Sequence, residues 1–372
     1  MSRMGQAAEV AGVRGVAKVQ QVARLGAWTL RCALALFLFV GALQLMKTGA
    51  GSLDVLQHNG FLVRNPGSTL GLGWIGALFV LSGSPIAASA LTLVSAGSIS
   101  EIQGFTMLTG SRLGAAFVVL VVAVIYALRG GRGERMKPVS TAVMALSGTA
   151  LIYLPAALLG FGLLTWGPFH SLDLQFPAQF GDVIDLVYGG LLARVENLPA
   201  GLIFLGGLGA LLLSFKLIDS VMPQLDDATV SGSRLAWLRK KWPMFALGCL
   251  VALVTMSVSV ALTVLVPLVA KGYAKREDIL PYILGANITT LGDTMLAAFA
   301  LQSAPAVRIV LAEVIATSTF SVILLAFFYP QLRRIIWSFQ RRVLKSKTSL
   351  AGFTAALFLV PLAIMTVSSL VT

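Results

Sequence analysis

Long apolar stretches, each close to the length that crosses a bilayer, restrict what this sequence can fold into. They lie at about 28–46, 70–98, 102–128, 139–165, 198–220, 244–271, 279–303, 307–329 and 350–371. About 20 apolar residues in a helix span the hydrocarbon core of a membrane. Charged residues make up only 12% of the 372 positions, whereas soluble domains carry about 25%. The sequence therefore predicts an all-α integral membrane protein whose main surroundings are the lipid bilayer.

Basic stretches separate these apolar segments and predict the orientation of the chain. Most of the 28 Lys and Arg residues fall in the N-terminal tail, 129–137, 234–241 and 333–347. The connection 166–197 is acidic instead, with Asp173, Asp182, Asp185 and Glu196 against Arg194. Positive loops stay cytoplasmic. We therefore expect a multi-pass protein of the plasma or inner cell membrane, with the N-terminus cytoplasmic and the C-terminus extracytoplasmic. The net charge of +13 is explained by these loops, so no nucleic-acid partner is expected.

Serine-centred breaks interrupt two of the apolar stretches. Ser82-Gly83-Ser84-Pro85 lies inside 70–98, and Ser257-Val258-Ser259 lies inside 244–271. The chain must cross the membrane an even number of times between its inner N-terminus and the inner stretch 129–137, yet three apolar stretches lie between them. One stretch must enter and leave on the same side. The break makes 70–98 the candidate, and the same count makes 244–271 a second re-entrant hairpin, since non-helical backbone is tolerated at membrane depth where protein or water surrounds it.

A constant offset of 175 positions relates the two halves of the sequence. It carries Ser82 onto Ser257, Ser84 onto Ser259 and Gly110 onto Gly285. Because the two hairpins open on opposite sides, we expect two inverted-topology repeats, an architecture in which transporters bind substrate near mid-membrane. The expected organisation is a cytoplasmic tail 1–27, repeat 1 at 28–165, an extracytoplasmic loop 166–197, repeat 2 at 198–330, a basic cytoplasmic segment 331–349 and a C-terminal transmembrane helix 350–372.

Short motifs accompany these breaks over about residues 30–300. They are Asn65-Pro66, the serine breaks, Ala96-Gly97, and Ile283-Leu284-Gly285-Ala286-Asn287-Ile288 followed by Thr289-Thr290. This pattern resembles the bacterial sodium/phosphate cotransporter family. The family usually has Gln-Ser-Ser-Ser in each hairpin and Gly-Ala-Asn-Ile-Gly-Thr-Thr after it. Here Leu81 and Met256 stand where glutamine is usual, and Arg112 stands at the asparagine position of the first half.

The resemblance implies a sodium-coupled symporter that imports inorganic phosphate by alternating access. Sodium would be the coupling ion, with no other cofactor, and the site would lie between the two hairpins. Hydroxyls and freed carbonyls suit a sodium ion, and helix N-termini suit an oxyanion. The expected substrate-binding residues are Ser82, Ser84, Arg112, Ser257 and Ser259. The expected ion-binding residues are Ser257, Ser259, Asn287, Thr289, Thr290 and Asp293. For each serine, a role as a backbone cap at a helix break is an equally good interpretation.

Three deep charges have more than one interpretation. A charge at mid-membrane is costly and usually functional. Arg112 either contacts the anion through its planar fork, replaces a bound sodium, or pairs with Asp293. Glu313 either carries a proton or cation, or pairs with Arg308 about one turn away, and we favour that ion pair.

Other functions stay open. A transporter of another small anion, coupled to protons or sodium, is one alternative, and a non-transporting relative with a scaffold or regulatory role is the other. An enzyme is not expected, since no nucleophile and base are paired in the sequence. His58 and His170 are isolated, so no metal site beyond sodium is expected. The oligomeric state is open, a homodimer included.

Overall fold

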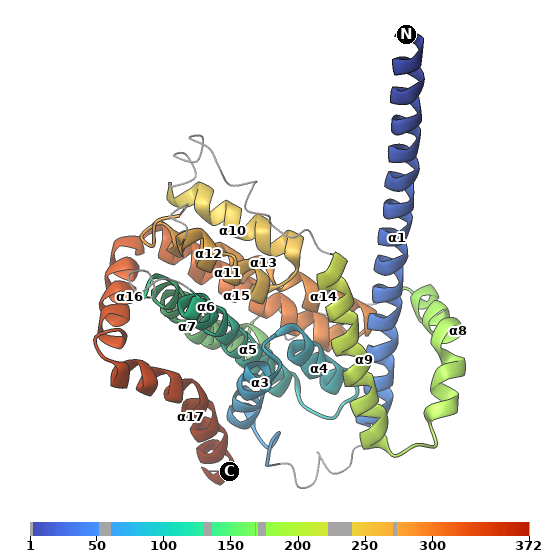
Figure 1. Cartoon of the computed structure of the whole chain (residues 1–372). Helices are drawn as coiled ribbons and strands as arrows, with labels where there is room; N and C mark the ends of the chain where they lie inside the picture. Colours follow the sequence, from blue (N-terminus) through green and yellow to red (C-terminus); the bar gives the residue numbers. More distant parts are fainter. Residues whose placement is uncertain are drawn as a thin grey trace.

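The fold is all-helical over the part of the chain that the structure describes. The computed structural model describes residues 3–51, 61–129, 136–167, 169, 176–221, 240–270 and 274–371, with side chains from residue 26 onward apart from 178, 180, 219, 221 and 371. No strand occurs among these residues. The helices are α1 (Arg3–Gly51), α3 (Pro66–Val80), α4 (Ser84–Ser95), α5 (Glu101–Ala115), α6 (Phe117–Arg129), α7 (Met136–Thr165), α8 (Ala178–Val195), α9 (Ala200–Val221), α10 (Lys241–Thr255), α11 (Val258–Thr263), α12 (Leu265–Ala270), α13 (Ile279–Thr289), α14 (Gly292–Ala300), α15 (Ala304–Ala326), α16 (Tyr329–Val343) and α17 (Lys347–Val371) (Figure 1).

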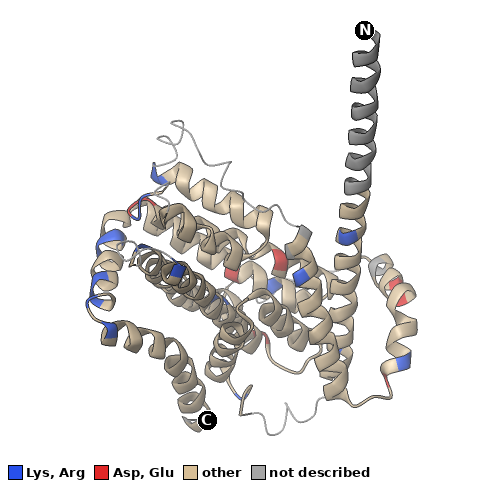
Figure 2. Cartoon of the chain, in the orientation of Figure 1, with Lys and Arg blue, Asp and Glu red and all other residues tan. Residues whose placement is uncertain are grey.

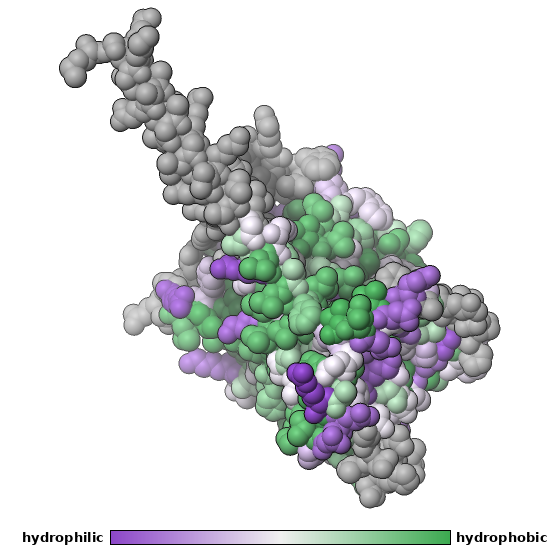
Figure 3. All heavy atoms as spheres, turned by 90° about the vertical axis from the view of Figure 1, so that its right-hand side faces the viewer, coloured by the Kyte–Doolittle hydropathy of each residue, from purple (hydrophilic) through white to green (hydrophobic). Residues whose placement is uncertain are grey.

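Seven candidate membrane spans occur among the described residues. They are Gly26–Gly51, Glu101–Arg129, Met136–Thr165, Ala200–Ile218, Ile279–Ala300, Ala304–Ala326 and Lys347–Leu370. They coincide with the seven predicted apolar stretches that lack a serine break. Large apolar side chains of α1, α8 and α9 stay exposed, and this side of the molecule presents a broad apolar face (Figure 3). An all-α, multi-pass membrane protein is therefore the fold, as the sequence predicts.

The two remaining apolar stretches are each divided by a residue in the left-handed region. Helix α3 ends at Leu81 with φ 56°, and α10 ends at Met256 with φ 46°. Helices α3 and α4 have 15 and 12 residues. A helix rises about 1.5 Å per residue, so neither is long enough for a hydrocarbon core of about 30 Å. The positions 81 and 256 are again 175 apart.

Close glycine contacts join the helices on either side of each break in the same way. A Cβ added at Gly110 would lie 2.1 Å from the carbonyl oxygen of Leu70, which brings α5 against α3. A Cβ added at Gly285 would lie 2.1 Å from the carbonyl oxygen of Phe245, which brings α13 against α10. The offset between the two contacts is 175 for both partners. Glycine at these positions allows the backbones to approach, as is common between membrane helices.

Two buried apolar clusters form the core, and each combines side chains from both halves of the chain. The first surrounds α4 and takes side chains from α1, α5, α14 and α15. The second surrounds α11 and α12 and takes side chains from α6, α7, α10 and α13. Each helix that follows a break is thus enclosed by protein, which is the condition for irregular backbone at membrane depth.

Three features of the helices differ from the sequence expectation. The stretch 102–128 bends at Ala116 between α5 and α6, and 279–303 is interrupted at 290–291 between α13 and α14. The acidic connection contains α8, which packs on α1 through a hydrogen bond from the Tyr188 hydroxyl to the Phe37 carbonyl, 2.8 Å. Figure 2 shows acidic residues on α8 and basic residues along α16, at opposite edges of the molecule. The apolar side chains of α8 explain why a segment expected as a loop is helical.

Candidate functional site

The two helix breaks lie against each other inside the molecule. The Ser259 hydroxyl at the second break donates to the Leu81 carbonyl at the first, 3.2 Å away. Ser257 caps α11, because its hydroxyl accepts from the Val260 N–H at 3.3 Å. A carbonyl freed by a left-handed residue is thus satisfied by a hydroxyl from the other half of the chain.

A small cavity of about 60 Å³ opens beside this junction. Its polar lining comes from Ser82, Ser84, Ser257 and Asp293. The apolar lining consists of Leu36, Phe39, Phe215, Ile218, Met256 and Leu296, from α1, α9, the second break and α14. One water needs about 10–15 Å³ of such space, so the cavity has room for a small ion with a few waters. Three of the predicted serines therefore share one cavity with the predicted aspartate.

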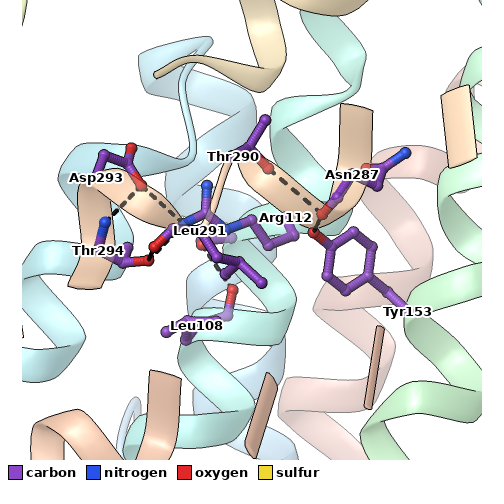
Figure 4. Close-up of polar contacts among 9 residues, drawn as sticks. Leu108, Arg112, Tyr153, Asn287, Thr290, Leu291, Asp293 and Thr294 are labelled. Atoms are coloured by element: carbon purple, nitrogen blue, oxygen red, sulfur yellow. Dashed lines mark hydrogen bonds and ion pairs between the residues drawn. The ribbon is translucent and has the colours of Figure 1, made fainter. Parts of the chain in front are cut away.

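A buried ion pair lies next to the cavity. Arg112 on α5 and Asp293 on α14 are 1% and 4% exposed, and Arg112 Nη2 is 3.4 Å from Asp293 Oδ1. The same nitrogen donates to Thr294 Oγ1 at 3.2 Å (Figure 4). Asp293 Oδ1 also accepts from the Thr294 N–H at 2.6 Å. The sequence hypothesis that Arg112 and Asp293 approach each other is confirmed.

This pair leaves two buried polar atoms without a hydrogen-bond partner among the described residues. They are Asp293 Oδ2 and Arg112 Nε. A buried polar atom normally has a partner, and each exception calls for an explanation. Ser84 lines the cavity together with Asp293. Asp293, a residue that lines the cavity, thus has one buried carboxylate oxygen without a hydrogen-bond partner among the described residues.

The remaining predicted ion ligands serve helix packing in this conformation. The Asn287 amide donates to the Ile283 carbonyl at 2.8 Å and to Thr149 Oγ1 at 3.2 Å. The Thr289 hydroxyl donates to the Cys249 carbonyl at 2.7 Å. Thr290 is buried and bonds back to the Asn287 carbonyl at 3.4 Å (Figure 4). Asn287, Thr289, Thr290 and Ser259 do not line the cavity.

The favoured pairing of Glu313 with Arg308 is wrong. Arg308 forms a two-pronged ion pair with Glu101 at the start of α5 instead. Five residues are about 1.4 turns of a helix, so the two side chains leave α15 in different directions. Glu313 is 0% exposed, and both of its carboxyl oxygens lie near Thr109 Oγ1, at 3.2 and 3.0 Å. No local motif marks this contact, because 204 positions separate the two residues.

Possible metal ligands do not gather at one place among the described residues. Among the described residues, no group of three or more His, Cys, Asp and Glu side chains is arranged to hold a metal ion. Both cysteines, Cys32 and Cys249, are free thiols in apolar helices. Comparisons with protein-family models, curated proteins and solved structures gave no match. The geometry of the breaks and of the buried charges is therefore what indicates a function.

Proposed function

We propose that this chain is a secondary symporter that imports a small oxyanion, inorganic phosphate first, with sodium as the coupling ion. The observation that carries the proposal is the cavity between the two helix breaks, lined by Ser82, Ser84, Ser257 and Asp293. Transporters commonly bind substrate and ions at such discontinuous helices.

The cation would bind at Asp293. The cavity is lined by three serines and by Asp293, which has one buried carboxylate oxygen without a hydrogen-bond partner among the described residues. Oxygen atoms are hard donors, which a sodium ion prefers to the softer sulfur and imidazole ligands. A sodium ion bound here would give Asp293 Oδ2 the partner that it lacks.

The anion would bind beside it, and the charges couple the two. Helix α4 begins at the cavity with Ser84, so the positive end of its dipole would favour an oxyanion there, although Pro85 supplies no N–H. Arg112 adds a positive charge that Asp293 neutralises at present. Sodium on Asp293 would compensate the carboxylate and leave the charge of Arg112 for the anion. Binding of each ion would then favour binding of the other.

Alternating access would come from two inverted repeats, 28–165 and 198–330, each with a re-entrant hairpin. The matched left-handed residues Leu81 and Met256 support this arrangement. So do the matched glycine contacts of Gly110 and Gly285. Inverted repeats allow the same site to be reached from either side by rocking one half against the other.

Uptake of labelled phosphate into proteoliposomes tests the proposal. We expect uptake that requires an inward sodium gradient. Ser257→Ala should raise the sodium concentration for half-maximal uptake about tenfold, since loss of one ligand is worth about 1.4 kcal/mol. Ser346→Ala, an exposed serine outside the cavity, is the matched control. Sodium-independent uptake would favour a transporter with another coupling ion. Absence of uptake for any small oxyanion would favour a scaffold or regulatory protein.

A further inference from the structure

Glu313 is a buried carboxyl group without a basic partner among the described residues. It lies on α15 within a membrane-spanning segment and is 0% exposed. Other charged residues of the described chain are paired, as Arg112 is with Asp293, Arg308 with Glu101 and Arg333 with Glu277. An isolated ionised carboxylate is very costly away from water, and such groups neutralise instead.

The hydrogen bonds around Glu313 fit a neutral carboxylic acid. Thr109 Oγ1 lies 3.0 Å from Glu313 Oε2, 3.2 Å from Oε1 and 3.0 Å from the Phe105 carbonyl. A threonine hydroxyl has one hydrogen, so it cannot donate to all of these oxygens. A protonated Glu313 resolves the conflict, because the acid donates to Thr109 Oγ1 and the threonine donates to the Phe105 carbonyl. An ionised Glu313 would receive one hydrogen bond at most from this hydroxyl.

A positive charge that could receive the ionised form lies one turn away. Arg112 follows Thr109 by three positions on α5, and residues at this spacing share a helix face. Its guanidinium is held by Asp293 and Thr294 at present. Sodium bound to Asp293 would weaken that hold, and once the transported anion has left, Arg112 could stabilise an ionised Glu313.

We propose that Glu313 carries a proton in this conformation and releases it to water on the inner side of the membrane during the transport cycle, so that a proton moves inward in addition to sodium. The release breaks the carboxyl O–H bond, leaves the electron pair on Glu313, and transfers the proton to water. This proposal rests on the proposed transport function, whereas the protonation of Glu313 in the resting state does not.

Other titratable groups lie on the helices that pack against α15. The elements packed on α15 are α4, α5, α7, α13, α14 and α16. They contribute Glu101 and Arg112 (α5), Lys137 and Tyr153 (α7), Tyr282 (α13), Asp293 (α14), and Tyr329, Arg333, Arg334, Arg341 and Arg342 (α16), whereas α4 has none. The Tyr153 and Tyr282 hydroxyls donate to the Asn287 and Ala261 carbonyls, each at 2.8 Å. Both tyrosine hydroxyls therefore donate their hydrogen to a backbone carbonyl and not to Glu313.

Infrared spectroscopy tests the resting proton without any transport. The full-length protein in liposomes at pH 7 should give the C=O stretching band of a buried protonated carboxyl group. Glu313→Gln should lack this band, and Glu101→Gln, which removes a carboxylate paired with Arg308, should retain it. Thr109→Val removes the acceptor, so it should shift the band to higher frequency. A wild-type spectrum without the band, or a band that persists in Glu313→Gln, would overturn the proposal.

Uptake assays test the release of that proton. In proteoliposomes with a fixed sodium gradient, an inward proton gradient should stimulate phosphate uptake by the wild type and by Glu101→Gln about tenfold. Glu313→Gln should transport at one rate with and without the proton gradient, since glutamine cannot release a proton. Equal stimulation of Glu313→Gln would show that the proton is structural and overturn its role in transport. Absence of uptake by the wild type would contradict the proposed function and the release step, and would leave the infrared result intact.

Discussion

Single residues decide the chemistry of the cavity, and the buried pair of Arg112 and Asp293 is central to it. The free-energy cost of removing two charges from water can exceed the attraction between them. Such a pair is therefore weak evidence for stability. Both partners have an atom without a hydrogen bond. An arrangement that is expensive and incompletely satisfied is better explained by a ligand that it binds than by the fold.

Removal of one partner of this pair should strongly destabilise the protein. Arg112→Gln leaves Asp293 buried without its countercharge and should lower the free energy of unfolding by about 3–5 kcal/mol. The double variant with Asp293→Asn should recover part of this loss, because no lone charge remains. Denaturant unfolding in detergent micelles measures both variants.

The matched control for this experiment is an exposed ion pair. Arg333 and Glu277 are 3.4 Å apart, with side chains 47% and 51% exposed. Arg333→Gln should cost less than about 1 kcal/mol, as is usual for surface pairs. Equal losses for Arg112→Gln and Arg333→Gln would contradict the role of burial.

The sequence predicted only some of these residues, and the reason is physical. Arg112 and Asp293 are recognisable because charges inside apolar stretches need a partner. Glu313 has the same signal, yet its contact with Thr109 depends on how α5 and α15 pack, which a sequence pattern does not contain. The helix-packing contacts of Asn287 and Thr289 were not predicted for a related reason, since a polar side chain in a membrane can bind an ion or join two helices, and their predicted ion binding stays a prediction.

Matched contacts between helices relate the two halves of the chain. The contact of α3 with α5 uses Gly73 and Gly110, and that of α10 with α13 uses Gly248 and Gly285. Apolar stretches and serine breaks were visible in the sequence because their composition is distinctive. The interruption at Ala116 was not, since alanine favours a helix and no local signal marks the position.

Alanine at the paired glycines should destabilise both halves. Gly110→Ala and Gly285→Ala each place a Cβ 2.1 Å from a backbone oxygen, which should cost about 1–3 kcal/mol of unfolding free energy by overpacking. Gly209→Ala in α9 is the control, because a Cβ there meets nothing within 4 Å. It should be neutral or slightly stabilising, since alanine favours a helix over glycine by about 1 kcal/mol. The same detergent unfolding assay checks all three, and a loss at Gly209→Ala as large as at Gly110→Ala would contradict the packing argument.

At the scale of the whole molecule, the order of crossings depends on the two broken stretches. Seven candidate spans plus two re-entrant hairpins would leave the chain termini on opposite sides of the membrane. Basic residues gather on α16, and acidic residues occur on α8 (Figure 2). This asymmetry is what the positive-inside rule requires of a cytoplasmic α16 and an extracytoplasmic α8.

Two engineered cysteines test whether 244–271 is re-entrant. Glu196 and Ser346 are exposed at the ends of α8 and α16. In a background with Cys32→Ala and Cys249→Ala, an impermeant thiol reagent should label Glu196→Cys in intact cells and Ser346→Cys only after permeabilisation. Labelling of both from the same side would mean that this stretch crosses the membrane completely.

The hydrogen bond between Ser259 and the Leu81 carbonyl has a kinetic consequence. It joins the two breaks, yet Ser259 does not line the cavity. Its net contribution of about 1 kcal/mol therefore stabilises this conformation and prolongs its lifetime, and it leaves the affinity for ions unchanged. Ser259→Ala should shorten that lifetime about fivefold, since 1.4 kcal/mol corresponds to a factor of about ten in rate. One hydroxyl between the halves would thus set how quickly the molecule leaves the state seen here.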